Sequence, residues 1–304
     1  MIHIYHHNDL DGKAAASVML NYYSCDNNNV LCDSENNEYF KASNDEDISC
    51  YKLTYRSTDF DNLDDIKKGD IVYVLDYSLN REQLLRLQHV NERALVVWCD
   101  HHVTSLQYKD MLPGKIDTSY CGAILIYKYA YGNGAKIPKH LKFVNDHDLW
   151  RHKLEHTREF KEGVDLGVFD GYIHPNLINL MDLWFKDEPN SQEYEELLNK
   201  IINDGACVLK YIIKDIDFSK PNLYECEFEG YKCIVINKFT NADMFEDVKN
   251  EYDICVTWIY TSEGKFKYTL YSDTINVSKI CQKYGGGGHF GAAGFSSDEL
   301  LFKL

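Results

Sequence analysis

The sequence predicts an α/β protein with a mainly parallel sheet, followed by a smaller C-terminal α/β domain that a helical linker joins to it. Up to about residue 150, apolar runs of strand length alternate with segments of helical periodicity, which is typical of βαβ units. From about residue 222, strand-like runs follow one another with glycines at the turns between them, as in hairpins. We therefore expect a first domain at 1–150, a helical linker region at 151–214 and a second domain at 215–304.

The elements of the first domain follow from its apolar runs and helix signals. Residues 2–5, 71–75 and 94–99 read as buried strands, and 51–54 as an edge strand. Residues 25–50 are polar and predict an irregular segment. Ser119 is a plausible N-cap for an apolar helix that runs to Tyr131. The other predicted helices are 12–23, 61–68, 80–90 and 138–145.

The remaining chain predicts three linker helices and a second sheet. Helical segments are expected at 156–164, 174–186 and 192–213. Strands are expected at 223–228, 231–236, 254–260 and 265–271, with helices at 242–250 and 277–284.

Composition narrows the class of protein. The formal net charge of -16 argues against a long duplex nucleic acid as partner, because such partners are met by basic surfaces. No stretch approaches the ~18 apolar residues of a membrane span, and no signal peptide is expected. The ten cysteines form no C-x-x-C pair, which disfavours structural zinc. These features predict a reduced cytoplasmic protein.

Three predicted strands end in His or Asp. His7, Asp9 and Asp11 follow the first, Asp76 ends the second, and Asp100-His101-His102 ends the third. The carboxyl ends of parallel strands meet at one sheet edge, where open α/β folds bind ligands. Carboxylates brought so close would repel one another, and Asp/His mixtures suit Mn2+ or a similar ion. An isolated Asp after a strand is often only a turn residue, so the prediction depends on the combination.

Two choices within this set stay open. His6 adjoins His7, and the spacing to Asp9 favours His7. Asp146 and Asp148 follow a helix-like segment, and either could reach the same edge or simply end a helix. We expect Asp146 to be a metal ligand and Asp148 to lie just outside the ligands.

Four consecutive glycines precede His289 near the C-terminus. Such a run costs backbone entropy, and a close approach of backbone N–H groups to a phosphate would explain it. A flexible linker is the alternative, but the run continues directly into the small apolar segment 292–295. We expect Gly286, Gly287, Gly288 and His289 to bind substrate.

Together these motifs resemble those of the DHH phosphoesterase superfamily over nearly the full chain. The catalytic domain of that family is matched by His7-Asn8-Asp9-Leu10-Asp11-Gly12, Asp76 and Asp100-His101-His102, and its associated substrate-binding domain by Gly286-Gly287-Gly288-His289. The resemblance implies two divalent cations, which we expect to be Mn2+. It places His7, Asp9 and Asp76 around one ion, and Asp11, Asp76, His101 and Asp146 around the other. Asp100 and His102 are the expected catalytic residues, with His102 facing the scissile phosphate and Asp100 either a ligand or an orienting residue.

The resemblance is to the type that degrades very short RNA, so we expect a phosphodiesterase that converts short single-stranded RNA, DNA or dinucleotides to mononucleotides. Many relatives carry Arg-Ser where this chain has Tyr271-Ser272. Tyr271 is expected near the substrate, where either it would stack on a base or another cation would take the place of the arginine. Alternatives are a phosphodiesterase for cyclic or linear dinucleotide signals and a 3'-phosphoadenosine phosphate phosphatase. A polyphosphatase is disfavoured because only Lys279 and Lys283 lie near the glycine run.

Two further classes remain as rivals. A catalytically silent nucleotide-binding module would be favoured by missing ligand positions, but these are filled. A structural interaction protein would leave the acidic cluster and the glycine run unexplained. A homodimer stays open as an oligomeric state.

Overall fold

The computed structural model describes residues 1–23, 31–32, 38–41, 46–55, 59–166, 191–288 and 290–302. Over these residues the chain divides into two compact units, Met1–Leu209 and Lys210–Leu304. Three expectations lie outside the described residues: the helix at 174–186, the substrate-binding role of His289 and much of the segment 25–50.

The first unit is built on a seven-stranded sheet of order β2-β3-β4-β1-β5-β6-β7. Strands β4, β1, β5, β6 and β7 run parallel, and β2 and β3 pair antiparallel at one edge. The strands are β1 (Ile2–His7), β2 (Leu31–Cys32), β3 (Glu38–Lys41), β4 (Asp47–Leu53), β5 (Ile71–Leu75), β6 (Leu95–Asp100) and β7 (Gly114–Ile116).

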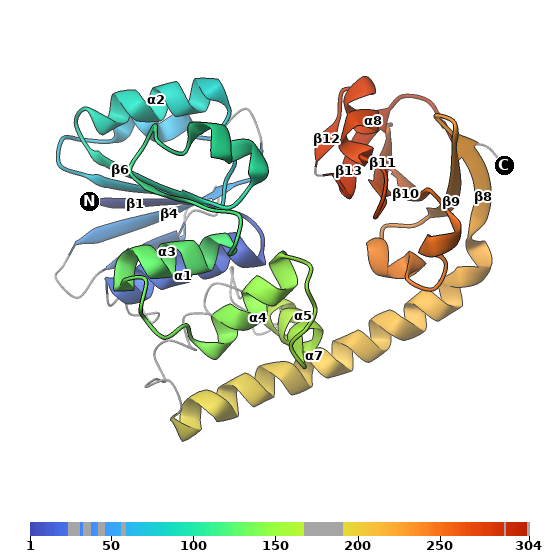
Figure 1. Cartoon of the computed structure of the whole chain (residues 1–304), viewed down its shortest axis with the longest axis horizontal. Coiled ribbons are helices and arrows are strands. Elements are labelled where there is room, and N and C mark those ends of the chain that lie inside the picture. Colours follow the sequence, from blue (N-terminus) through green and yellow to red (C-terminus); the bar gives the residue numbers. More distant parts are fainter. Residues whose placement is uncertain are drawn as a thin grey trace. The chain divides into compact units, whose positions relative to one another are not determined.

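Helices cover both faces of this sheet (Figure 1). Helices α1 (Leu10–Tyr22) and α3 (Gly122–Tyr131) pack on one face and α2 (Arg81–Asn91) on the other. Successive strand residues point to opposite faces, so Ile4 joins the core under α1 and α3 while Tyr5 joins the core under α2. Burial on both faces explains why these strands are continuous apolar runs. The unit also contains α4 (Lys139–Asp148), α5 (Thr157–Leu166), η2 (Asp61–Asp65) and η3 (Val103–Tyr108).

Two local predictions for the first unit differ from the structure. The expected edge strand at 51–54 is the end of a longer strand, β4, in which β3 pairs with residues 47–50 and, among the described residues, 51–53 pair only with β1. Ser119 does not cap α3, since the helix begins only at Gly122 and its N-cap residue is Cys121. The N–H of Cys121 instead donates to the Asn145 side chain at 3.0 Å.

The second unit is a six-stranded mixed sheet of order β12-β13-β11-β10-β9-β8, in which only β9 and β10 are parallel among the described pairs. Helix α7 (Gln192–Ser219) begins in the first unit and ends in the second. The other elements are η5 (Lys220–Asn222), β8 (Tyr224–Phe228), β9 (Tyr231–Asn237), η6 (Ala242–Phe245), η7 (Lys249–Glu251), β10 (Ile254–Tyr260), β11 (Phe266–Tyr271), α8 (Val277–Lys283), β12 (Gly287–Gly288) and β13 (Ala292–Ser297).

The predicted fold class is confirmed: a mainly parallel α/β sheet is followed by a smaller α/β unit. The helix expected at 242–250 is wrong, because the chain forms two short 3-10 turns there. Within the described ranges, no helix is both long and apolar enough to cross a bilayer.

Candidate active site

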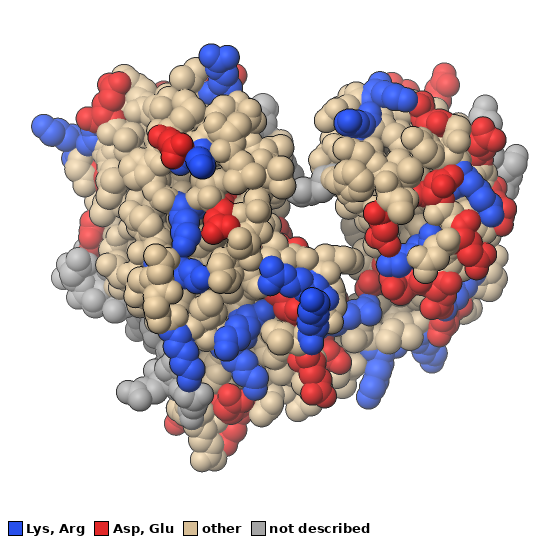
Figure 2. Space-filling view, in the orientation of Figure 1, with Lys and Arg blue, Asp and Glu red and all other residues tan. Residues whose placement is uncertain are grey.

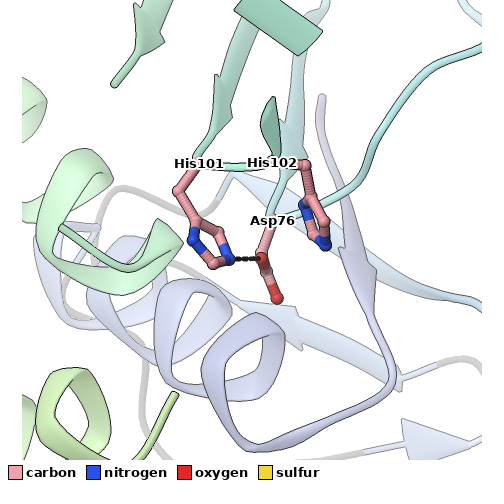
Figure 3. A group of neighbouring side chains, drawn as sticks. All are labelled: Asp76, His101 and His102. Atoms are coloured by element: carbon pink, nitrogen blue, oxygen red, sulfur yellow. Dashed lines mark ion pairs between the residues drawn. The ribbon is translucent and has the colours of Figure 1, made fainter. Parts of the chain in front are cut away.

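The adjacent parallel strands β1, β5 and β6 bring their expected site residues to one edge of the sheet. The Nε2 atom of His101 lies 3.2 Å from Oδ1 of Asp76 (Figure 3), and Nδ1 of His7 lies 3.7 Å from Oδ2 of the same residue. Three groups of side chains have donor atoms close enough to share an ion: His7, Asp9 and Asp76; Asp76, His101 and His102; and Asp11, His101 and Asp148. Asp76 and His101 each belong to two of these groups, so the three groups form one continuous cluster.

Asp76 is fully buried at the end of β5, with its backbone in the left-handed region at φ 54°. Among the described residues, neither of its carboxylate oxygens accepts a hydrogen bond. Burial, followed by the nearby charges of Asp11 and Asp9, raises the pKa of this carboxyl well above its usual value. A buried, ionised carboxylate without hydrogen bonds destabilises the folded protein unless a cation binds beside it.

Asp11 reaches across the sequence to the start of α3. Its Oδ2 accepts the N–H of Gly122 at 2.6 Å and its Oδ1 accepts that of Ala123 at 2.9 Å. These are orphan donors of a helix N-terminus, and a carboxylate satisfies them well. Burial raises the pKa of Asp11 overall, although the charge of His101 opposes that shift. Sequence analysis missed this contact because Ser119 offered a local cap.

Two glycines permit the close approach of the site's elements. A Cβ atom on Gly12 would lie 2.1 Å from the carbonyl oxygen of His7, so the glycine lets α1 start directly against β1. A Cβ atom on Gly122 would lie 2.6 Å from Cβ of Asp76 and 3.1 Å from Oδ2 of Asp11. Gly122 therefore fixes how closely α3 approaches the acidic cluster.

Replacing Gly122 by alanine is expected to displace Asp76 and weaken Mn2+ binding by roughly tenfold to a hundredfold, as when the surroundings of metal ligands are disturbed. Overpacking should also lower the free energy of unfolding by about 1–3 kcal/mol. The matched control is Gly134→Ala, where an added Cβ meets no atom within 4 Å. Calorimetric titration with Mn2+ and urea unfolding measure both effects; equal behaviour of the two variants would contradict the assignment.

The structure brings Asp148, rather than Asp146, to the acidic cluster. Oδ2 of Asp148 lies 3.3 Å from Nε2 of His101, beside Asp11. The Asp146 carboxylate instead accepts hydrogen bonds from the N–H groups of Lys153 and Leu154, both at 3.0 Å, and from the Thr157 hydroxyl at 2.6 Å. Burial and the charge of Asp11 raise the pKa of Asp148 well above its usual value, as for Asp76.

Asp100 orients its neighbour. Its Oδ1 lies 2.7 Å from Nδ1 of His102, and its Oδ2 accepts the Ser105 hydroxyl at 2.5 Å. Burial alone would raise the pKa of Asp100, but the hydrogen bond from His102 lowers it overall. Burial would lower the pKa of His102, but the hydrogen bond with Asp100 raises it, and the pKa is raised overall. Of the two alternatives for Asp100, the geometry favours the orienting one.

His6 and His7 occupy different surroundings. His6 is fully buried, its Nδ1 lies 2.8 Å from the carbonyl oxygen of His7, and burial lowers its pKa to about 4. Nδ1 of His7 lies 2.8 Å from Oδ2 of Asp9, whose other oxygen accepts the N–H of Gly12. The structure thus brings His7, not His6, to the acidic cluster.

The glycines of the second unit that are expected to bind substrate lie in strand β12 and just before it. Gly287 and Gly288 form β12, which pairs with β13. A Cβ on Gly286 would lie 2.1 Å from the carbonyl oxygen of Gly294, so strand packing explains that glycine, whereas Gly287 is exposed with open space around it. Tyr271 is half-buried, its ring 6.5 Å from that of Phe245.

The donor set of the first unit suits divalent cations. Imidazole nitrogens and carboxylates are grouped around Asp76, whose oxygens are buried without a donor among the described residues. Ligands of this mixture favour borderline and hard ions such as Mn2+ or Mg2+. The side chains that could hold metal are therefore present, and the three groups overlap at Asp76 and His101.

Two known proteins are similar in sequence to this chain over nearly its whole length. No family model matches the chain. It is 22% identical to uncharacterised protein R106 of Acanthamoeba polyphaga mimivirus, over 96% of this chain and 66% of that protein. It is 22% identical to oligoribonuclease NrnB of Bacillus subtilis (strain 168), over 100% of this chain and 75% of that one. The chain thus spans just under two thirds of the first relative's length.

The crystal structure of exonuclease RecJ bound to manganese has the same fold. Its TM-score is 0.51 at 14% identity, with 98% of this chain and 86% of that chain covered. The chain therefore shares its fold with this exonuclease and is similar in sequence to an oligoribonuclease.

Proposed function

We propose that this protein is a phosphodiesterase that uses two Mn2+ ions to hydrolyse short single-stranded oligonucleotides, dinucleotides included, to mononucleotides. The strand-end motifs resemble those of DHH phosphoesterases, and on this proposal the protein is a hydrolase of phosphoester bonds. The observation that carries the finer proposal is the pair of ligand groups joined at Asp76. The similarity to an oligoribonuclease supports the substrate class.

His7, Asp9 and Asp76 would hold one ion, and Asp11, Asp76, His101 and Asp148 the other. When bound, two such ions lower the pKa of water and offset charge that develops on phosphoryl oxygens. The side chains contribute position: β1, β5 and β6 fix the ligands on rigid strand ends, and α3 holds Asp11 through two N–H groups. Gly287 remains our candidate for a phosphate contact because it is exposed and open.

His102 would act on the phosphate itself. Burial would lower the pKa of the ring, but Asp100 holds the ring in one orientation and raises its pKa overall, which favours the protonated form. A protonated imidazole stabilises negative charge on a phosphoryl oxygen or donates to the leaving oxygen.

Replacing Asp100 by asparagine is expected to lower kcat by roughly tenfold to a hundredfold, the usual cost of losing a group that orients an active-site histidine. Metal stoichiometry should stay at the wild-type value, because Asp100 is outside the three ligand groups. Steady-state kinetics and metal analysis of the same preparation test this. Loss of metal together with activity would show that Asp100 is a ligand.

The charge of the molecule supports small substrates. Basic and acidic side chains are mixed over the face in Figure 2, and the formal net charge is -16. A long nucleic acid is bound mainly through many phosphate contacts to Lys and Arg. A substrate with one or two phosphates needs few such contacts beyond the metal ligands.

The test is a length series of end-labelled RNAs of two, five and about two dozen nucleotides, incubated with Mn2+ and with Asp76→Asn as the matched control. We expect rapid, Asp76-dependent loss of the dinucleotide, with the long RNA nearly untouched. Cleavage of none of them would overturn the oligonucleotide proposal. Cyclic dinucleotides, 3'-phosphoadenosine phosphate and silent nucleotide binding would then be assayed with the same pair of proteins.

A further inference from the structure

A pocket of about 360 Å³ lies within the first unit, directly beside the acidic cluster. Asp9, Asp11 and Asp148 line one part of it, and His147 and Trp150 line another. Its volume falls in the range of small-molecule sites. The pocket therefore joins the candidate metal ligands to an aromatic ring that the proposed chemistry does not use.

Trp150 is unusually exposed for so large an apolar side chain, at 60%. Its ring centroid lies 4.9 Å from that of His152 at 76°, and 6.0 Å from that of His147 at 47°. Neither imidazole lies parallel to the indole, so neither stacks on its face. An exposed indole with no described ring stacked parallel on it can accept a planar ligand.

The backbone around Trp150 is strained. Trp150, His152 and His156 have φ values of 52°, 45° and 72°, in the left-handed region that bulky residues rarely adopt. Such strain persists only where surrounding contacts over-determine the conformation, and it gathers at ligand sites.

Asp146 supplies those contacts. Its carbonyl oxygen accepts the N–H groups of Arg151 and His152 at 2.9 and 3.2 Å, and its carboxylate holds residues 153, 154 and 157 as described above. Asp146 thus accepts hydrogen bonds from five residues after α4, while the N–H of Trp150 itself donates to the carbonyl oxygen of His147 at 2.9 Å. Asp146 is a positioning residue, and the loop that it organises carries Trp150 next to Asp148.

We propose that Trp150 stacks on a nucleobase of the substrate, beside the phosphate that the acidic cluster and its metals would hold. This inference rests on the proposed function and adds the residue that would select substrates carrying a base. A ring face next to a metal-phosphate site selects a ligand with both a planar π system and a phosphate, which is a nucleotide. Stacking accepts every base because each has a π face, so the protein would require a base without reading its identity.

The first test compares an adenine dinucleotide with the same compound carrying an abasic ribose at one position. Trp150→Ala should raise KM for the complete dinucleotide by roughly tenfold to a hundredfold with little change in kcat, and should leave KM for one of the two abasic isomers unchanged. Trp150→Phe should retain most of the affinity. Leu154→Ala removes an exposed side chain from the same loop, outside the pocket, and should behave as wild type. Equal effects of Trp150→Ala on the complete and on both abasic substrates would overturn the proposal.

A second measurement separates this inference from the proposed function. Adenosine monophosphate should quench tryptophan fluorescence of the Mn2+-loaded wild type but not of Trp150→Phe, and ribose 5-phosphate should quench neither. If the protein cleaves dinucleotides without this quench, stacking is wrong and the proposed function stands. If the quench occurs and no oligonucleotide is cut, nucleotide stacking stands and the proposed function fails.

Discussion

Replacing Asp76 by asparagine is expected to reduce phosphodiesterase activity by roughly a thousandfold or more, which corresponds to losing the several kcal/mol that metal ions contribute. Asp76 is the residue that joins two ligand groups, so its loss should affect both ions. Kinetics with a dinucleotide and titration with Mn2+ measure this. Retention of two bound ions would contradict the central place of Asp76.

The same variant is expected to be more stable than the wild type when metal is removed. Burial and neighbouring acids raise the pKa of Asp76, so the folded state holds a proton that the unfolded chain releases above about pH 4. Stability of the metal-free protein should therefore fall as pH rises from there towards the raised pKa. Asp76→Asn removes this contribution, so its advantage in thermal unfolding should grow with pH. A constant difference across pH would refute the explanation.

Asp148→Asn is expected to reduce metal affinity, whereas Asp146→Asn is expected to reduce the stability of the fold. Asp148 faces His101, so its replacement should weaken Mn2+ binding by at least about tenfold without lowering the stability of the metal-free protein. Asp146→Asn should keep the ions and lower the free energy of unfolding by about 2 kcal/mol, since charge-assisted hydrogen bonds are lost. Mn2+ titration and urea unfolding of both variants distinguish the two roles.

The pH dependence of the Asp146 variant should be the reverse of that for Asp76. Burial alone would raise the pKa of Asp146. Hydrogen bonds from Thr157, Leu154 and Lys153 outweigh burial, so the pKa is lowered overall. Its stabilising contribution is therefore complete above the unfolded pKa of about 4 and is lost as pH falls through the folded pKa. The cost of Asp146→Asn should shrink in acid. Loss of metal in this variant, with Asp148→Asn retaining it, would restore the order that the sequence suggested.

Local pattern determined much of the fold. Apolar runs specified β1, β5 and β6, and polar residues at their ends predicted one shared edge. This works because strand burial and parallel pairing impose a pattern on consecutive residues. The full length of β4 could not be inferred, because the pairing of β3 with residues 47–50 depends on residues without a periodic signal.

Contacts between distant residues were decided only by tertiary structure. Asp11 finds its helix N-terminus 111 residues away, which no local spacing encodes. Asp146 and Asp148 both lie in α4, and residues two apart on a helix point about 200° apart. Spacing therefore says that only one of them can face the sheet edge, and the packing of α4 against its neighbours selects Asp148. The sequence by itself thus predicted the kinds of side chain and the edge where they meet, whereas helix packing decided which of the two carboxylates joins the cluster.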